Sequence, residues 1–546
     1  MNTLLMLVAL SAVITPFICL VLLRMSALVG MTISAIVVTL LGFSVWGIEA
    51  GVIGASLLQG AHKTLTIILI LFGALTLLNT LRETNAVARI NASFQSVSSD
   101  MRIQVIIVAF LFGSLIEGAS GFGTPAMVTA PLMVALGFRP LVSVTTALIA
   151  DSISVSFGAV GTPVIVGLST LKRANEQLFS ETAIHITLID LFSGVFIPLI
   201  IVTTMIIFFG KSNKLNAVLE ILPWTLLIGA VYAIVAWIYA SLTGPEFVSI
   251  LSSLTTLIVA VVTARKGWLV PKNEWTEALT DDYKVSDLSQ PHEMSLLAAW
   301  SPYLIVVVLL LLTRIVAPVK TLTTTVLDLS WTHILGYPTI SSSWQLLYSP
   351  GTILFIAAIF AILIQRKSFR HFSKACKDSA KTISVTGFTL IATLAMVHVF
   401  SNSGLNSKDL LSMPEFIANG MAHTFGDMWL FVAPFLGALG SFITGSATVS
   451  TLTFAPVQAN IADAIGADLY TVLAAQVIGG AAGNMICVHN VVAVCAVVNM
   501  AGKEGSVIRK TLGPALLYCA LVGISAFVFA TFFGSLSTSV GETITH

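Results

Sequence analysis

Apolar residues fill most of this chain in long runs, each about as long as a bilayer is thick. A hydrocarbon core about 30 Å thick needs roughly 20 apolar residues in a helix. The pattern therefore predicts membrane-spanning helices over residues 3–23, 27–48, 63–81, 103–117, 183–209, 219–241, 243–264, 297–315, 351–365, 383–400 and 511–534. The first run lacks a basic leading segment and is followed by Arg24 instead of a small-residue cleavage site. We interpret it as a span and not as a signal peptide.

Two further apolar regions, residues 118–170 and 429–500, are interrupted by Gly, Pro, Ser and Thr. Backbone that is not helical can lie at membrane depth only where protein buries it or where it lines a wet cavity. The predicted fold class is all-α and polytopic, with roughly 12–16 spans that include broken or re-entrant helices.

The two interrupted regions share features in the same order. Gly158–Val164 (GAVGTPV) is similar to Gly480–Ile486 (GAAGNMI), and each follows a polar break, at Gly118–Pro125 and at Thr444–Thr451. A short glycine turn lies between the two features in both regions. This order favours a two-fold internal repeat, with chance similarity as the alternative.

One hydrophilic segment of mixed charge divides the chain near its middle. The predicted organisation is a first membrane half (1–264) with a broken-helix region (118–170), a linker loop (265–296), and a second half (297–546) with its own broken-helix region (444–490). The segment Arg366–Lys381 holds six basic residues and one acid, so we expect it to be cytoplasmic. Arg24 after the first span suggests that the N-terminus faces away from the cytoplasm.

Composition supports a membrane protein and excludes several other classes. The 546 residues are 56% hydrophobic and only 9% charged, whereas soluble domains carry about 25% charged residues. Mean hydropathy is +0.98. A net charge of +1 gives no reason to expect a nucleic-acid partner, and five scattered cysteines indicate neither a disulfide framework nor a metal cluster. We expect no metal and no cofactor, and the lipid bilayer as the main surrounding.

Breaks at matching places of two halves are typical of a transporter's binding site. The start of a half-helix exposes free N–H groups and the positive end of the helix dipole, which suits an anion such as a carboxylate. The alternative for each glycine is close helix packing.

At these breaks the chain resembles the bacterial L-lactate permease family. The similar stretches are Leu115–Pro125, Phe157–Pro163, Phe442–Ser446, Gly479–Ile486 and Ala501–Gly505. The resemblance implies proton-coupled uptake of lactate, and in relatives of glycolate and other 2-hydroxy monocarboxylates, across a bacterial cytoplasmic (inner) membrane. It also reveals three departures.

Relatives carry an acid where this chain has Ala447 and a lysine where it has Asn484, and an asparagine is expected at Asp151. Loss of an acid and a base together keeps the local charge unchanged, as expected for two groups that pair in the relatives. Ala447, Asn484 and Asp151 therefore distinguish this chain from its relatives at the breaks.

Three titratable residues are predicted to couple transport to protons or ions: Glu117, Asp151 and His489. Charged groups inside spans are costly and usually functional. Each has a structural alternative: Glu117 can cap the broken helix, Asp151 can pair with a base elsewhere, and His489 can hydrogen-bond a neighbouring helix.

The predicted substrate contacts are small, hydroxyl or amide residues within or beside the breaks, where they can donate to carboxylate and hydroxyl oxygens, together with one aromatic wall. They are Gly121, Phe122, Gly123, Thr124, Ser154, Thr162, Ser446, Thr448, Ser450, Asn484 and Asn490.

A secondary transporter working by alternating access fits these observations best. The alternatives are Na⁺ coupling with a different organic acid or zwitterion and, less well supported, a channel. A membrane enzyme is disfavoured because the chain has no zinc-protease motif, nucleophile elbow or aspartate-rich diphosphate motif. A homo-oligomer is compatible with the sequence.

Overall fold

The computed structural model describes residues 3–23, 25–95, 97–121, 123–169, 171, 173–211, 213–280 and 294–542. Within these ranges the fold is helical and contains no strand, which confirms the predicted all-α class. Arg24 and Phe122 lie outside the described residues, and so do residues 281–293 of the linker.

The helices of the first half include several that are short or interrupted, with η marking 3₁₀ or π segments. They are α1 (Thr3–Ala9), α2 (Ser11–Pro16), η1 (Phe17–Leu22), α3 (Ala27–Leu41), η2 (Gly42–Trp46), α4 (Ala50–Glu83), α5 (Ala86–Gln95), α6 (Met101–Val105), η3 (Ile106–Phe112), α7 (Gly113–Ser120), α8 (Thr124–Ala135), α9 (Pro140–Ala150), η4 (Ile153–Phe157), α10 (Gly158–Ile165), α11 (Glu176–Asp190), η5 (Gly194–Phe196), α12 (Ile197–Phe209), α13 (Lys214–Thr243) and α14 (Val248–Lys266).

The second half shows the same mixture of long and interrupted helices. They are α15 (Leu296–Ile315), α16 (Ala317–Thr325), η6 (Ile334–Gly336), α17 (Pro350–Ile364), α18 (Phe369–Ser401), η7 (Asn402–Gly404), α19 (Met413–Phe425), η8 (Gly426–Met428), α20 (Trp429–Thr444), α21 (Ala447–Ile465), α22 (Leu469–Asn484), α23 (Val488–Val497) and α24 (Glu504–Glu542).

The chain is a multi-pass membrane protein. Among the described residues, 8 helices are long and apolar enough to cross a bilayer, or up to 11 if each bent pair counts as one span. Three shorter apolar helices, α8, α17 and α20, add partial crossings. The predicted total of roughly 12–16 full and partial spans agrees with this set.

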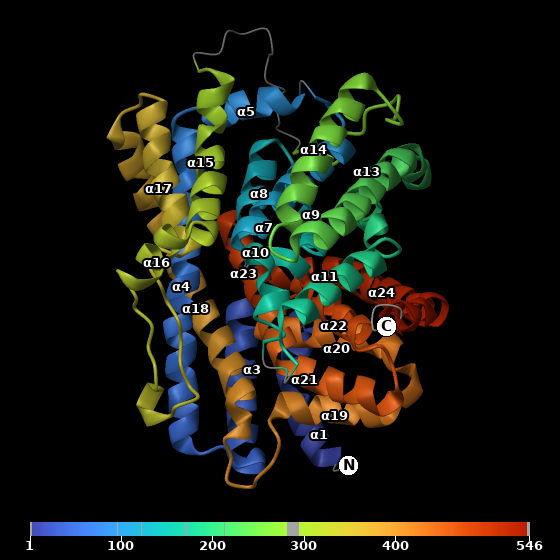
Figure 1. The fold of residues 1–546 in the computed structure, drawn as a ribbon. Coiled ribbons are helices and arrows are strands. Elements are labelled where there is room, and N and C mark those ends of the chain that lie inside the picture. The colour runs from blue at the N-terminus through green and yellow to red at the C-terminus, as the bar shows by residue number, and fades with distance from the viewer. Residues whose placement is uncertain are drawn as a thin grey trace.

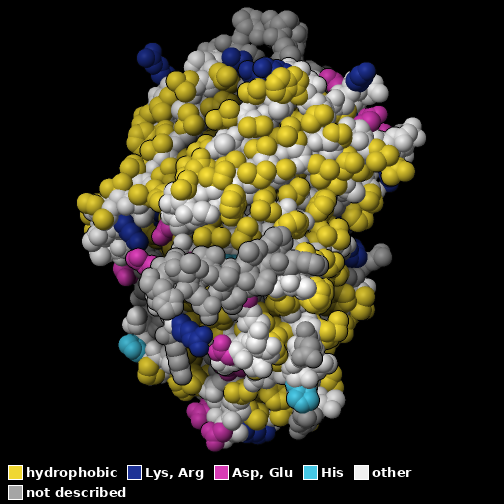
Figure 2. Space-filling model, turned by 45° about the vertical axis from the view of Figure 1, so that its right-hand side comes forward, with side chains coloured by type: hydrophobic (Ala, Val, Ile, Leu, Met, Phe, Trp, Pro, Cys, Tyr) yellow, Lys and Arg dark blue, Asp and Glu magenta, His cyan; other side chains and the backbone are white. Residues whose placement is uncertain are grey.

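The surface is apolar where lipid would cover it. Figure 2 shows a broad hydrophobic face, with Lys and Arg side chains gathered at its upper rim. Large side chains such as Ile258 on α14 and Val308 on α15 are exposed. Such an apolar surface is costly in water but suits the hydrocarbon core of a bilayer.

The two halves are interlocked. The long helix α4 packs against α17 and α18 of the second half, and the last helix α24 packs against α9 and α11 of the first. Figure 1 shows α4 and α18 running side by side along one edge of the molecule. Neither half could therefore bury its own apolar faces alone.

Part of the linker is anchored to the first half. Arg102, which is 1% exposed, forms a 2.6 Å ion pair with Asp100 and donates to the carbonyl oxygen of Asn273 at 2.8 Å. Arg139 donates to the carbonyl oxygen of Glu277 at 2.8 Å. Residues up to 280 are thus held against the ends of the first-half helices.

The broken regions have the same order of elements in both halves. The first runs from α7 through a break to α8, then through a turn to α9 and a second break; the second does so from α20 through α21 to α22. The similar heptapeptides fall differently, however: Gly158–Val164 follows its second break, whereas Gly480–Ile486 leads into its own. That pair does not mark equivalent positions, and the repeat itself stays a prediction.

Candidate functional site

The first break separates α7 from α8 and depends on two glycines. Gly121 has φ 62° and Gly123 has φ 73°, a left-handed conformation that L side chains rarely adopt. A Cβ on Gly121 would also lie 2.9 Å from the Cβ of Ala159. The glycines therefore let this break pack directly against the next one, in α10.

The second break begins at Asp151, where α9 ends, and includes a left-handed turn. Ala159 has φ 47°, Val160 has φ 58° and Gly161 has φ 76°. A β-branched residue at positive φ is a conformational outlier, and such outliers concentrate at functional sites. The surrounding packing thus holds this turn in a conformation that its sequence does not favour.

The second half supplies two more breaks. Gly445 has φ 74°, and the Ser446 hydroxyl then caps α21 by accepting from the N–H of Val449 at 3.3 Å. Helix α22 ends at Asn484, and α23 begins at Val488. The break between α20 and α21 is therefore set by a left-handed glycine and a side-chain cap.

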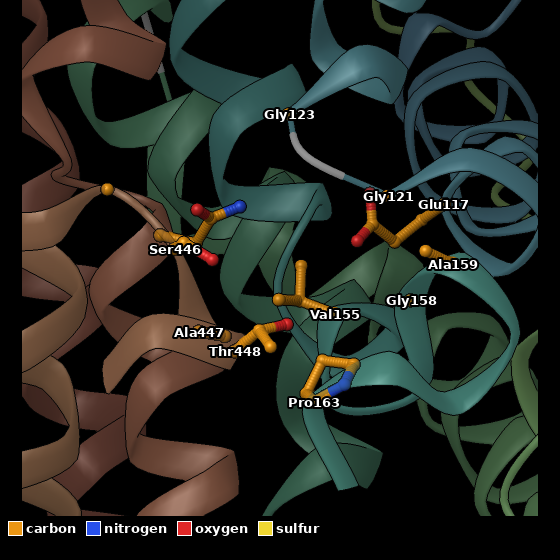
Figure 3. Close-up of a pocket in the computed structure, with 12 residues that line it drawn as sticks. Glu117, Gly121, Gly123, Val155, Gly158, Ala159, Pro163, Ser446, Ala447 and Thr448 are labelled. Carbon is orange, nitrogen blue, oxygen red and sulfur yellow. The ribbon is translucent and has the colours of Figure 1, made fainter. Parts of the chain in front are cut away.

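The four breaks converge on one small cavity that is lined from both halves of the chain. In Figure 3 the Glu117 carboxyl group points into the space that separates it from Ser446 and Thr448. The lining residues are Glu117, Gly121, Gly123, Val155, Gly158, Ala159, Pro163, Gly445, Ser446, Ala447, Thr448 and Asn484. Six of these were predicted from the sequence: Glu117, Gly121, Gly123, Ser446, Thr448 and Asn484.

Of the two predicted acids, Glu117 lines this cavity, and Asp151 lies behind the lining residue Asn484. Glu117 and Asp151 are 2% and 4% exposed, and their carboxyl groups face each other within hydrogen-bonding reach. Asp151 Oδ2 accepts from Asn484 Nδ2 at 3.3 Å, but Glu117 Oε2 and Asp151 Oδ1 have no donor. A proton held between the two carboxyl groups would satisfy an oxygen on each side.

An amide chain continues from this acid pair. Asn490 Nδ2 donates to Asn484 Oδ1 at 2.6 Å, and a Cβ on Gly123 would lie 2.6 Å from Asn490 Oδ1. Asp151, Asn484 and Asn490 therefore link the second break of each half back to the first break. The side chains that sequence analysis chose from distant segments form one connected network.

The predicted hydroxyls divide into two groups. The Oγ atoms of Ser154 and Thr124 are buried without a hydrogen-bond partner and do not line the cavity, whereas Ser446 and Thr448 do line it. The Thr162 hydroxyl donates to the carbonyl oxygen of Ala159 at 2.5 Å, and the Ser450 hydroxyl to that of Gly437 at 2.7 Å. Neither Thr162 nor Ser450 lines the cavity.

His489 lies behind the cavity wall. A Cβ on Gly445 would overlap its ring, and its Nδ1 is 3.4 Å from Cys487 Sγ. His489 also lies within electrostatic range of Lys63 on α4, as does His398 on α18. A group of basic side chains thus stands next to the Gly445–Ser446 break.

Sequence reasoning did not select two ionisable residues in the interior. The predicted span 63–81 begins at Lys63, but α4 begins at Ala50, so Lys63 lies within a continuous helix. Asp190 lies within the predicted span 183–209 and is 3% exposed. The signal for Asp190 was available, because a carboxylate inside an apolar run is uncommon unless it has a role.

Comparison with known proteins shows which family the chain belongs to. The family model for L-lactate permease matches residues 5–533. The chain belongs to the L-lactate permease family. The match covers nearly the whole length of the chain. Membership of a permease family indicates a transporter and not an enzyme.

Individual relatives are distant but cover most of the chain. A protein of Haemophilus influenzae is 30% identical over 506 residues, covering 89% of this chain and 90% of that protein. The L-lactate permease of Bacillus subtilis is 28% identical, covering 80% of each chain. The glycolate permease GlcA of Escherichia coli is 29% identical, covering 82% of each. These values describe a divergent member of the permease family.

A solved structure gives a weaker likeness. The YdaH transporter of Alcanivorax borkumensis aligns over 86% of each chain with a TM-score of 0.32 and 14% sequence identity. This similarity is too low to support a conclusion about the permease's fold or function.

Proposed function

We propose that this permease takes up L-lactate, or a related 2-hydroxy monocarboxylate such as glycolate, by proton symport across a bacterial cytoplasmic membrane. Family membership supports a small carboxylate substrate. Relatives named for lactate and for glycolate are about equally similar to this chain, so the proposal covers both acids.

The observation that carries proton coupling is the pair Glu117 and Asp151 at the cavity. Two ionised carboxylates side by side in a buried site repel each other, and burial penalises both charges. No lysine or arginine lines the cavity among the described residues. An anionic substrate would add a third negative charge, so a proton on the acid pair is needed before or with substrate binding.

The opposite side of the cavity suits the substrate's carboxylate. The N-terminal residues of α21, Ser446 to Thr448, line it, and α8 begins just after Gly123. Free N–H groups and the positive ends of helix dipoles favour an anion there. The hydroxyls of Ser446 and Thr448, which line the cavity, can donate to the substrate's 2-hydroxyl or carboxylate oxygens.

The test is uptake of labelled L-lactate and glycolate by purified permease in liposomes under an imposed pH gradient, with and without a protonophore. We expect accumulation that collapses when the protonophore is added. Glu117→Gln and Asp151→Asn should each lower accumulation by at least about tenfold, since proton transfer by a positioned group typically contributes 10²–10⁴ in rate. Accumulation that ignores both the pH gradient and the protonophore would refute symport with protons.

The matched control is Asp463→Asn. Asp463 is an acid on α21 with its side chain 58% exposed, at the protein surface next to Arg173. Because this change removes a carboxylate outside the cavity, uptake should stay close to that of the unaltered permease.

Sodium coupling is the second candidate. Asp151 Oδ1 and the Ser154 hydroxyl are buried, unpartnered oxygens close together in the chain, and Na⁺ binds several oxygen ligands. Uptake driven by a Na⁺ gradient at equal pH, and lost in Asp151→Asn, would favour this function over proton symport.

A further inference from the structure

An apolar groove runs along the outer surface between α12 of the first half and α24 of the second, away from the cavity described above. It has a volume of about 430 Å³, and its α12 wall extends from Phe196 to Phe208. The side chains of Ile207, Phe208 and Leu517 are 50%, 46% and 47% exposed, so the groove is open on its outer side. Helix α24 stands at the edge of the molecule in Figure 1. The groove therefore faces the lipid, with a shape that suits a long apolar chain.

Two lysines stand at one end of this groove. Lys510 Nζ lies 5.0 Å from the ring centroid of Phe208, and Lys214 Nζ donates to the carbonyl oxygen of Ile207 at 2.6 Å. Ile207 and Phe208 are consecutive residues of the groove wall, so both ammonium groups lie at the same end. Within the part of the chain that the structure describes, neither lysine forms an ion pair with an acid. This end of the groove is therefore complementary to an anion.

The lysine end of the groove lies at the border between hydrocarbon and water. Arg102 donates to the carbonyl oxygen of Ala217, three residues after Lys214, and to that of Asn273 in the hydrophilic linker, both at 2.8 Å. The start of α13 thus lies at the same level as the linker. A lysine at this level can lay its apolar stem along the protein and keep its ammonium group near water. Phospholipid headgroups lie at the same depth.

We propose that the groove binds one acyl chain of an anionic phospholipid, and that Lys214 and Lys510 bind the phosphate group of that lipid. Basic sites between membrane helices near the aqueous surface are suited to acidic headgroups. A zwitterionic lipid would bring its own positive amine close to the two ammonium groups and is therefore disfavoured. The bound lipid would contact α12 and α24 together, and so would join the two halves of the permease. The proposal is independent of the transported substrate and of the coupling ion.

The test measures lipid binding to the full-length permease in detergent by native mass spectrometry. The probes are phosphatidylglycerol and phosphatidylcholine with the same acyl chains. We expect phosphatidylglycerol affinity to fall by about fivefold in Lys214→Gln and in Lys510→Gln, and by about thirtyfold in the double variant, the contribution typical of lysines beside acidic lipid. Added salt should weaken this binding, and phosphatidylcholine binding should not change. Lys408→Gln, which alters an exposed lysine far from the groove that donates to Val45, is the matched control and should keep full affinity.

Leu517→Trp tests the groove without touching either lysine. Its indole would take the place of part of the acyl chain. Phosphatidylglycerol affinity should fall by at least about tenfold, because each buried methylene group contributes about fourfold to lipid binding. Leu304→Trp is the matched control, since Leu304 is an equally exposed leucine on α15. An unchanged melting temperature in lipid-free detergent checks that each variant is folded.

Each other outcome overturns the proposal. Equal affinity for both lipids, or full phosphatidylglycerol affinity in the double lysine variant, would mean that the lysines do not select an anionic lipid. Loss of binding in the lysine variants with full binding in Leu517→Trp, and displacement by inorganic phosphate, would mean that the lysines bind a phosphate group without an acyl chain in the groove. A lipid-free dimer that Leu517→Trp converts to a monomer would mean that a second copy of the chain covers the groove.

Discussion

At the scale of single residues, Gly158 controls the position of the acid that the proposal depends on. A Cβ on this glycine would overlap Glu117 Oε1. Gly158 has φ −62°, so alanine is acceptable to the backbone and the conflict is with the carboxyl group alone. The end of a flexible side chain can move aside, and the fold should survive.

We therefore expect Gly158→Ala to displace the Glu117 carboxyl group and to lower lactate uptake by about tenfold to a hundredfold, the effect typical of a misplaced functional group. The measurement is initial uptake rate in liposomes, normalised to the amount of folded protein. Gly513→Ala is the control, since a Cβ at Gly513 meets nothing within 4 Å. An unchanged rate in Gly158→Ala would show that the position of Glu117 does not matter.

Two positions of the cavity differ from the family pattern, and the structure lets the difference be tested. Ala447 and Asn484 both line the cavity. A Cβ on Gly480, one helical turn before Asn484, would lie 3.4 Å from Ala447 Cβ. An aspartate at 447 and a lysine at 484 would therefore be close enough to pair, as the resemblance implies for relatives.

Ala447→Asp alone adds a third acid beside Glu117 and Asp151, and should abolish uptake. Combined with Asn484→Lys, the added charges can pair, and uptake should recover by at least about tenfold over the single aspartate variant, because an unpaired buried charge costs about 3–5 kcal/mol. A double-mutant cycle on uptake rates measures the coupling. Additive effects would mean that the two positions do not interact.

Sequence reasoning identified the residues of the site that lie at glycine breaks, because breaks inside apolar runs are visible as composition. Glu117, Ser446 and Asn484 are examples. It could not show that the Tyr518 hydroxyl donates to Asp190, because that hydrogen bond joins helices far apart in the chain. Sequence analysis also predicts Ser450 as a substrate contact; in the structure its hydroxyl donates to the carbonyl oxygen of Gly437 on α20, and the role in binding stays a prediction.

At the scale of elements, close helix packing depends on glycines whose neighbours are backbone atoms. A Cβ on Gly479 of α22 would overlap the carbonyl oxygen of Pro434 on α20, and a Cβ on Gly483 would lie near that of Ala438. Backbone atoms of two packed helices cannot move aside as a side chain can. The α20–α22 contact should therefore be sensitive to added volume.

We expect Gly479→Ala to lower the free energy of unfolding by about 1–3 kcal/mol, the usual cost of overpacking. The melting temperature in detergent can be followed with a thiol-reactive dye, since Cys487, Cys495 and Cys519 are buried in the folded protein. Gly513→Ala again serves as control and should not lower the melting temperature. Equal melting temperatures of the two variants would mean that α20 and α22 can move apart without losing stability.

The predicted spans located most long helices but not their ends. The apolar runs 63–81 and 219–241 lie inside the longer helices α4 and α13. Hydropathy reports the thickness of the hydrocarbon layer, whereas helices continue beyond it as long as their backbone hydrogen bonds are made. The breaks were predicted as regions, and only the structure shows that all four meet at one cavity.

At the scale of the whole molecule, basic residues collect at one end. The segment Arg366–Lys381 lies next to the end of α4, where Lys374 Nζ is 2.8 Å from Glu83 Oε1. Gln365 donates to the carbonyl oxygen of Ala298, so the start of α15 lies at this end too. In Figure 1 this is the upper end, and α1 lies at the opposite one.

The positive-inside rule then predicts that the Lys374 end is cytoplasmic and that α1 lies toward the other side. Cysteines introduced singly at Lys374 and at Lys408, in a Cys376→Ser background, test this with a membrane-impermeant thiol reagent. Both lysines are exposed, and Lys408 donates to the carbonyl oxygen of Val45 at the opposite end. We expect Lys374→Cys to react only in inside-out vesicles and Lys408→Cys only in right-side-out vesicles. The reverse pattern would invert the orientation and place the basic end outside the cell.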